Sequence, residues 1–565
     1  MRFRADTACA LALALTLGLA ACATSAATKP PEPAAGTDTN AAVVVAELAL
    51  ERGQCRESSE AYARAAAGST DATLAARATQ VAMGCEQLDT AQRAANRWQQ
   101  LAPARGEPAL ARALVAMKHY QVDEARKALS LWKDSGATGN QDPGRFAELL
   151  ESETETTVAY KVFGDVLVDD DATADVVLAQ ATLALHAYDW HRAAALAQRA
   201  IDLEAGLVPA RVVQIRARAL LGETDAAVAA ASELRDRLGG EDAFLVADVL
   251  STGQRNEAAR AELERQRANP QLAAAADRRL GAMSMEQGDL DDAEKRFTGL
   301  LGSRGSTTVA MMYLGQIFER RGDDERALRS YALLADSTVS LMARGAAARL
   351  LLRHGKRDEA LGLFDAYQKA HPENAIETIG ARAQLFAGQG DATTAVAVLE
   401  AALKDYPGHP QLEYQRATML ERAGRHAEAE RAFEQLLKKR PEDPGIVNAL
   451  GFTLADHQRS LDRAEKLVRQ ALAVSPDNPA IQDSLGWVQF RRGRLPEAAQ
   501  VLELAWRNGR DAEIGAHFGE VLWKRGEEGR ARYVWQQALN LDPDNALVRS
   551  TQARLTGEEA PAGRR

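Results

Sequence analysis

The sequence predicts an all-α fold in which pairs of helices repeat along most of the chain and form a superhelical solenoid of about fifteen pairs. Three observations predict it. From Ala41 onward, apolar residues recur at helical spacing, with hardly any of the alternation typical of strands. Small residues recur every 32 to 35 positions, and glycines and prolines keep the same period at fixed distances from them. Three series that share one period are not a by-product of an alanine-rich composition.

The small-residue series marks the second helix of each pair. It follows each turn between helices, where a larger side chain would hold the two helices apart. The series consists of Ala193, Ala226, Ala258, Ala293, Ala327, Ala360, Ala395, Ala429, Ala464, Ala498 and Ala531. Toward the N-terminus the same phase continues, although the accompanying marks fade, at Ala61, Ala91, Ala125 and Ala159.

Glycines and prolines mark the ends of the predicted helices. Five residues before the alanines, a glycine allows a turn with positive φ: Gly253, Gly288, Gly322, Gly355, Gly390, Gly424 and Gly493. Twelve residues after them, a proline ends the second helix: Pro270, Pro372, Pro407, Pro441, Pro476 and Pro543. Leu-Gly pairs predict close contacts inside the first helices, at Gly281, Gly315, Gly451 and Gly486.

A period of about 34 residues with this pattern is typical of the tetratricopeptide repeat. We expect a degenerate repeat solenoid over residues 41–270 and a regular solenoid with a capping helix over residues 271–556, followed by a disordered tail over 557–565. A closing helix is predicted at Ala546–Leu555, because terminal repeats need a cap over their apolar face.

Residues 1–21 have the composition of a secretory signal peptide. Two arginines precede an apolar stretch, and Leu19-Ala20-Ala21 stands directly before Cys22. This segment resembles the lipobox of bacterial lipoproteins. The resemblance implies cleavage after Ala21 and acyl chains on Cys22, which would anchor the protein in a membrane. The alternative is an ordinary secreted protein in which this cysteine occurs by chance.

The residues after Cys22 extend this prediction. Ala23 stands where an aspartate would suggest retention in the inner membrane of enteric bacteria, so we expect the periplasmic face of the outer membrane. Residues 22–40 are rich in Ala, Thr, Pro and Gly, which is typical of a flexible tether. No later apolar run reaches the roughly 18 residues that a membrane span needs.

Two cysteines, Cys55 and Cys85, lie in the predicted repeats. An oxidising compartment would let them form a disulfide. Each stands six residues before an alanine of the small-residue series, and equivalent positions of stacked helix pairs usually lie beyond the Cα distance limit of about 7 Å for a bridge. The sequence leaves open whether they are bridged.

Composition and motifs argue against nucleic-acid binding, catalysis and metal binding. The chain has 69 basic and 79 acidic residues, and nucleic-acid binding needs a concentrated basic face. No phosphate loop, His-Glu-x-x-His, Gly-x-Ser-x-Gly or Cys-x-x-Cys motif occurs. His186 and His191 are five residues apart, which does not place them on one helical face. We therefore expect no enzymatic activity, no cofactor and no metal.

The first helices of the last repeats predict a protein-binding groove. Aromatic and charged residues recur there at helical spacing, although only 5% of the chain is aromatic. Aromatic residues flanked by charge are common anchors of protein interfaces. The alternative is that these aromatic residues pack against the adjacent repeat or the closing helix. The candidate groove residues are Asn448, Phe452, Asp456, Asp483, Trp487, Phe490, Arg491, Glu520, Trp523 and Lys524.

The same segments carry a resemblance to a known family. Asn448-Ala-Leu-Gly-Phe-Thr-Leu-Ala-Asp456, Asp483-Ser-Leu-Gly-Trp-Val488 and Ala516-His-Phe-Gly-Glu-Val-Leu-Trp523 resemble a family of proteobacterial tetratricopeptide lipoproteins. Phe452 stands where that family would have tyrosine. The close match covers about residues 445–541.

The resemblance implies a non-enzymatic, lipid-anchored adaptor. Its expected partners are a periplasmic carboxyl-terminal processing protease and the peptidoglycan hydrolases that the protease degrades. A second hypothesis is an assembly factor for a secretion, pilus or exopolysaccharide export machine. An enzyme acting on peptidoglycan would need a carboxylate or metal cluster, which the repeat pattern does not supply.

Overall fold

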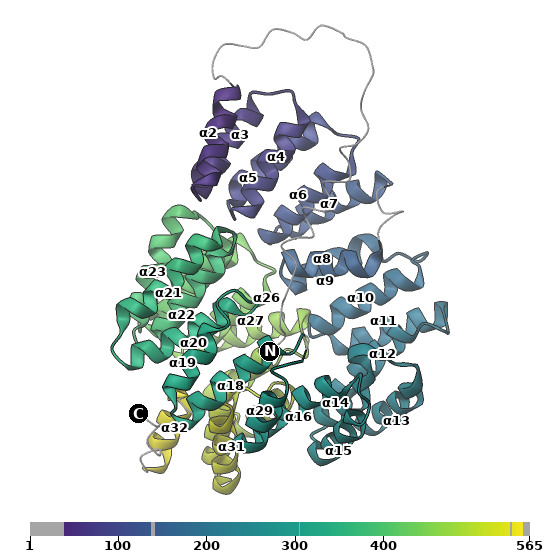
Figure 1. Cartoon of the computed structure of the whole chain (residues 1–565), viewed down its shortest axis with the longest axis vertical. Coiled ribbons are helices and arrows are strands. Elements are labelled where there is room, and N and C mark those ends of the chain that lie inside the picture. The colour runs from purple at the N-terminus through teal and green to yellow at the C-terminus, as the bar shows by residue number, and fades with distance from the viewer. Residues whose placement is uncertain (1–38, 137–141, 304, 543–544, 558–565) are drawn as a thin grey trace. The chain divides into compact units, whose positions relative to one another are not determined.

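A computed structural model describes residues 39–136, 142–303, 305–542 and 545–557. Within these ranges the secondary structure is helical and contains no strand, which confirms the predicted all-α repeat solenoid (Figure 1). The predicted signal peptide over residues 1–21, Cys22, nearly all of the tether and nearly all of the tail lie outside the described residues. No described helix is long and apolar enough to span a membrane.

The first sixteen helices of the described chain form eight successive pairs. They are α2 (Thr39–Glu51), α3 (Cys55–Ala67), α4 (Ala72–Gly84), α5 (Leu88–Leu101), α6 (Gly106–Lys118), α7 (Val122–Asp134), α8 (Pro143–Glu153), α9 (Thr156–Leu167), α10 (Ala174–His186), α11 (Trp190–Leu203), α12 (Val208–Leu220), α13 (Thr224–Leu234), α14 (Leu245–Thr252), α15 (Asn256–Arg267), α16 (Ala273–Gln287) and α17 (Leu290–Gly299). Two short 3₁₀ helices, η2 (Arg235–Arg237) and η3 (Gly240–Phe244), precede α14.

Seven further pairs follow in the same order, and one helix closes the series. They are α18 (Thr307–Arg321), α19 (Asp324–Ala332), α20 (Ser340–Arg353), α21 (Arg357–Ala370), α22 (Ala375–Gly388), α23 (Ala392–Asp405), α24 (Pro410–Arg422), α25 (His426–Lys439), α26 (Pro444–Asp456), α27 (Leu461–Val474), α28 (Pro479–Arg491), α29 (Leu495–Asn508), α30 (Ala512–Lys524), α31 (Glu528–Leu541) and α32 (Ala546–Thr556). The predicted closing helix at Ala546–Leu555 coincides with α32. A 3₁₀ helix, η4 (Pro372–Asn374), precedes α22.

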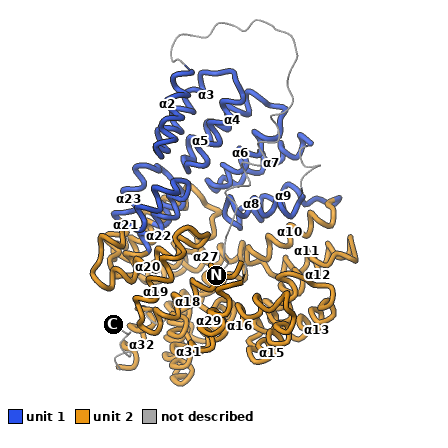
Figure 2. Tube along the Cα trace, in the orientation of Figure 1, with its two compact units in different colours: residues 1–171, 362–384, 397–415 blue, residues 172–361, 385–396, 416–565 orange. Residues whose placement is uncertain are grey.

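The chain divides into two compact units (Figure 2). Unit 1 comprises residues 1–171, 362–384 and 397–415, and unit 2 comprises residues 172–361, 385–396 and 416–565. The predicted division at residues 270–271 is of another kind, because it separates degenerate repeats from regular ones by how closely they match the sequence pattern. That division stays a prediction.

Burial explains why small residues recur in the second helices. Most alanines of the predicted series are fully buried, including Ala293, Ala464 and Ala531, so each second helix can lie close to its neighbours. Two members were assigned one residue too early. Ala226 and Ala258 are exposed, and Ala227 and Ala259 occupy the buried positions.

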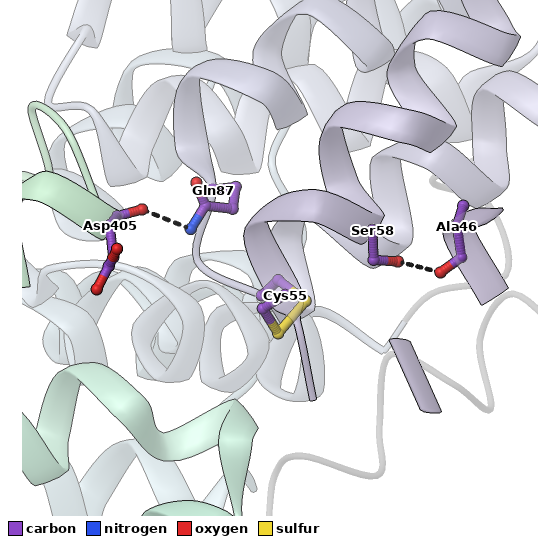
Figure 3. The surroundings of a disulfide bond; sticks show 6 residues. Ala46, Cys55, Ser58, Gln87 and Asp405 are labelled. Carbon is purple, nitrogen blue, oxygen red and sulfur yellow. Dashed lines mark hydrogen bonds between the residues drawn. A yellow bond between two sulfur atoms is a disulfide. The ribbon is translucent and has the colours of Figure 1, made fainter. Parts of the chain in front are cut away.

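The first pair departs from the predicted register by one helical turn. The buried small residue that corresponds to Ala91 is Ser58, because each lies five residues after the left-handed residue of its turn, Glu86 and Gly53 respectively. The Ser58 hydroxyl donates a hydrogen bond of 2.8 Å to the backbone carbonyl of Ala46 on α2 (Figure 3). Ala61 is buried too, one turn further along α3.

The turns between paired helices use one backbone geometry whether or not glycine is present. Gly288, Gly424 and Gly493 have φ values of +82°, +72° and +78°, as the glycine series predicts. Gly253 does not adopt this conformation, because its φ is −77°. The next residue, Gln254, adopts the left-handed conformation in its place, with φ 60°. The same conformation occurs without glycine in other turns, at Glu86, Tyr120, Tyr188 and Gln458.

Glycines inside the first helices are required by contact, as the Leu-Gly pairs predict. A Cβ atom on Gly486 would lie 2.5 Å from Cγ of Leu502 on the paired helix. A Cβ atom on Gly281 would lie 2.9 Å from the Phe297 ring, and one on Gly451 would lie 2.7 Å from Val468. These separations are well below van der Waals contact, so the paired helices cross at these glycines.

A disulfide joins Cys55 and Cys85 in unit 1, with Cα atoms 5.3 Å apart (Figure 3). The expected larger distance assumed that the two cysteines hold equivalent repeat positions. They do not, because Cys55 lies two residues after the left-handed residue of its turn, whereas Cys85 lies one residue before Glu86. Beside the bridge, Gln87 Nε2 donates a hydrogen bond of 3.2 Å to the carbonyl of Asp405, which also belongs to unit 1.

Candidate partner-binding surface

The candidate residues lie on three first helices of unit 2, α26, α28 and α30, which pack side by side, with α32 beside α30. Each of the three begins at a cap residue whose side chain accepts backbone N–H groups of the first turn. Asp443, Asn478 and Asp511 are these residues, and proline follows two of them at the first helical position. The caps fix where each helix begins, and so which side chains share a face. We call the surface that the candidate residues form on α26, α28 and α30, with α32 beside them, the α26–α32 face.

Trp487 connects α28 to α26. Its indole Nε1 donates a hydrogen bond of 3.0 Å to Oδ1 of Asp456, and Arg491 donates one of 2.6 Å to the backbone carbonyl of Asp456. The guanidinium of Arg491 also lies over the Trp487 ring, 5.6 Å from its centre. Trp487 is only 6% exposed, so the expectation of an exposed aromatic anchor is wrong for this residue. It packs against the adjacent repeat because its polar atom finds a partner there.

A buried ion pair connects α30 to α28. Nδ1 of His517 lies 2.9 Å from Oδ2 of Asp483, and both side chains are buried. The imidazole also stacks on Trp487, with ring centres 4.3 Å apart, and lies 5.8 Å from the Phe452 ring. Burial opposes the charged imidazolium, but the Asp483 carboxylate outweighs it and raises the pKa of His517 above its usual range.

The closing helix completes the face. Arg554 of α32 donates a hydrogen bond of 2.7 Å to Oε2 of Glu520, which is buried. Trp523 stacks on Trp535 of α31, with ring centres 5.7 Å apart, and the Arg532 guanidinium lies over its ring. The closing helix therefore satisfies the charge of one predicted groove residue.

The ten predicted residues fall into two groups. Three are buried and hold neighbouring helices together: Asp483, Trp487 and Glu520. Seven keep part of their side chain accessible to solvent: Asn448, Phe452, Asp456, Phe490, Arg491, Trp523 and Lys524. The accessible group combines aromatic rings with both signs of charge. That composition is typical of a protein interface.

Sequence reasoning missed two residues of this face. His517 lies on α30, three residues before the candidate Glu520, and is not among the ten predicted residues. It stands 34 residues after Asp483, which is the repeat period, and this spacing could have revealed the pair. Arg554 carries the same signal, because it stands 34 residues after its partner Glu520, although α32 follows the last helix pair.

Comparisons with known proteins agree with this fold. Residues 284–338, 381–444 and 452–513 match the family model of the tetratricopeptide repeat. These segments are tetratricopeptide repeats. A TPR repeat-containing protein of Pseudomonas aeruginosa is 27% identical over 253 residues, an alignment that covers 45% of this chain and 43% of the relative. The match thus spans less than half of the relative's length.

Two solved structures are similar at low sequence identity. A crystal structure of a TPR protein from Thermus thermophilus is 20% identical, covers 32% of this chain and all of its own length, and has a TM-score of 0.30. The crystal structure of yeast Tom70 is 15% identical, covers 75% of this chain and 96% of its own, and has a TM-score of 0.35.

Proposed function

We propose that this chain is a non-enzymatic, lipid-anchored scaffold that binds other proteins through the α26–α32 face. One observation carries the proposal. Accessible aromatic and charged side chains lie on helices that polar contacts join to one another, above all the buried pair of Asp483 with His517 and the hydrogen bond from Trp487 to Asp456. A face that is already ordered loses little conformational entropy when a partner binds.

The partner that the sequence resemblance favours is a periplasmic carboxyl-terminal processing protease, together with the peptidoglycan hydrolases that it degrades. A scaffold with two binding surfaces would raise the effective concentration of one partner near the other. Acyl chains on Cys22 would hold the scaffold at the periplasmic face of the outer membrane, where these hydrolases act. The lipobox-like segment before Cys22 supports this location.

Affinity purification with a matched control tests the binding face. The tagged chain is purified from envelope extract, and bound proteins are identified by mass spectrometry. The double variant Phe452→Ala, Lys524→Glu changes two accessible residues of the face. Tyr533→Ala is the control, because Tyr533 is an aromatic residue 64% exposed on the second helix α31. Loss of a processing protease and its hydrolases from the double variant alone supports the proposal.

Other outcomes separate the alternatives. Recovery of secretion, pilus or polysaccharide export components, lost in the double variant, would favour the assembly-factor hypothesis. Equal recovery by the double variant and the unchanged chain would contradict the assignment of this face. Circular dichroism and thermal melting of all the variants show whether each has the native helical content.

The lipid anchor has a separate test. Cells that express the chain are grown with a radiolabelled fatty acid, and the envelope is separated into inner and outer membrane. We expect label on the unchanged chain, in the outer-membrane fraction, and none on Cys22→Ser. Equal labelling of Cys22→Ser, or an unlabelled wild-type chain, would contradict the proposed anchor.

A further inference from the structure

Three potential metal ligands converge in unit 2, and one of them, His457, directly follows the face residue Asp456. Glu421 lies in the last turn of α24, His426 is the first residue of α25, and His457 follows α26 as its C-cap. One ligand atom from each residue lies within 4.8 Å of the other two. The three residues therefore come from three successive helices and meet where one repeat joins the next.

The geometry around Glu421 is that of a shared carboxylate. Nδ1 of His426 lies 2.8 Å from Oε1 of Glu421, and Nε2 of His457 lies 2.5 Å from the same oxygen. The two imidazole rings are tilted by 48° to one another, with centres 3.9 Å apart. One oxygen thus serves both imidazoles, while the second oxygen, Oε2, is buried and has no hydrogen-bond partner among the described residues. A buried carboxylate oxygen without a partner is costly, and a cation would relieve that cost.

The arginines beside these ligands pair with other glutamates. Arg422 lies 3.5 Å from Glu513, Arg425 lies 2.7 Å from Glu428, and Arg459 lies 2.9 Å from Glu430. The site also has an opening, because the His426 side chain is 49% exposed, whereas those of Glu421 and His457 are 20% and 24% exposed.

We propose that Glu421, His426 and His457 bind a divalent transition-metal ion of the zinc class. Two imidazole nitrogens and one carboxylate oxygen form a common three-ligand set for zinc, with a fourth position left for water or another donor. Ideal tetrahedral ligands lie roughly 3.3 Å from one another at zinc bond lengths. The two nitrogen–oxygen separations, 2.5 and 2.8 Å, are shorter than that value, so the side chains rotate apart to admit the ion.

Metal binding would fix which nitrogen of each imidazole carries the proton. Each imidazole now points the nitrogen that would coordinate toward Glu421. To coordinate, neutral His426 presents the Nδ1 lone pair and carries its proton on Nε2, and neutral His457 presents Nε2 and carries its proton on Nδ1. The metal then replaces the two imidazole–carboxylate contacts, and Glu421 coordinates as the anion. Metal affinity consequently depends on pH, because metal ligands must be deprotonated to coordinate.

Titration of the full chain tests this site. The chain is purified in detergent, stripped of metal with a chelator and titrated with Zn²⁺ by calorimetry, and with Co²⁺ to record its visible absorption bands. We expect one ion per chain, with bands of tetrahedral intensity. Glu421→Gln and His426→Ala should each weaken binding by more than about a hundredfold, because loss of a direct ligand costs more than the roughly 10- to 100-fold effect of losing an outer-shell partner.

His354→Ala is the matched control. His354 also contacts a carboxylate, with Nε2 2.8 Å from Oδ2 of Asp324, and the described site there contains no second histidine. This variant should bind Zn²⁺ like the unchanged chain. Glu421→Gln keeps the side-chain shape, and circular dichroism shows whether it folds. No binding by the unchanged chain, or unchanged affinity in both Glu421→Gln and His426→Ala, would overturn the proposal.

Discussion

Gly519 provides the sharpest test of how the paired helices are held together. It lies inside α30, and a Cβ atom there would lie 2.5 Å from Cδ1 and 2.6 Å from Cε2 of Trp535, a fully buried ring on α31. Overpacking of this kind costs roughly 1–3 kcal/mol, and a rigid indole places the cost near the upper end. Alanine also favours the helix over glycine by about 1 kcal/mol. We therefore expect Gly519→Ala to lose a net amount of about 2 kcal/mol.

Native-state hydrogen exchange measures this loss where it occurs. A repeat protein of this length unfolds in parts, so one global melting curve would not isolate the last pair. A loss of about 2 kcal/mol speeds exchange in α30 and α31 by about thirtyfold. The control is Gly362→Ala in α21, where no atom lies within 4 Å of the added Cβ, and helix propensity alone should slow exchange there. Equal or slower exchange in Gly519→Ala would refute the contact argument.

Three further predictions concern turns, charge and the disulfide. Gln458→Gly should stabilise its turn by about 1 kcal/mol, because Gln458 has φ 52°, and Gly493→Ala should destabilise its turn by a similar amount. Hydrogen exchange of the flanking helices measures both effects. Unchanged exchange in both variants would contradict the argument from backbone strain. The pKa of His517 is raised by folding, so its stabilisation is complete below the unfolded value of about 6.5 and is lost as pH rises through the folded value. Protection factors of α30, corrected for the pH dependence of intrinsic exchange, should fall over this pH range in the unchanged chain and stay constant in His517→Gln. Identical pH profiles in the two proteins would exclude the ion pair as the source of the loss. Replacing Cys55 and Cys85 by alanine should destabilise the first two pairs by about 3–4 kcal/mol for a 30-residue loop, so intact protection there would contradict the bridge.

Packing constraints made most of the fold predictable from sequence. A second helix can approach its neighbour only through a small residue, so positions such as Ala464 and Ala531 are constrained in every repeat. First helices cross at Gly451 and Gly486 for the same reason. These demands recur at each repeat, and so they leave a periodic signal.

The N-terminal repeats were harder to predict because several of their turns do without glycine. Glu86, Tyr120 and Tyr188 adopt the left-handed conformation that Gly288 adopts in later repeats. Surrounding packing holds them there at a cost of about 1–2 kcal/mol each. The first pair also uses serine at its close contact, Ser58, so an alanine series assigns its register one helical turn too late.

The candidate site was predictable as a location but not in its details. Helical spacing identified the stripe on α26, α28 and α30, yet it could not show that the polar atom of Trp487 meets Asp456 across a repeat boundary. It also could not bring together Glu421, His426 and His457, which fit no ligand motif in sequence. Contacts between repeats depend on the rotation from one helix pair to the next, and no local pattern encodes that rotation.

Site-specific photo-crosslinking in living cells shows whether the α26–α32 face contacts a partner protein. A benzoylphenylalanine at position 452 replaces Phe452 on the α26–α32 face, and one at position 533 replaces Tyr533 on the second helix α31. We expect a discrete crosslinked protein from position 452, identified by mass spectrometry as a processing protease or its hydrolase substrate, and none from position 533. Crosslinks from position 533 alone, or none from position 452, would contradict this expectation.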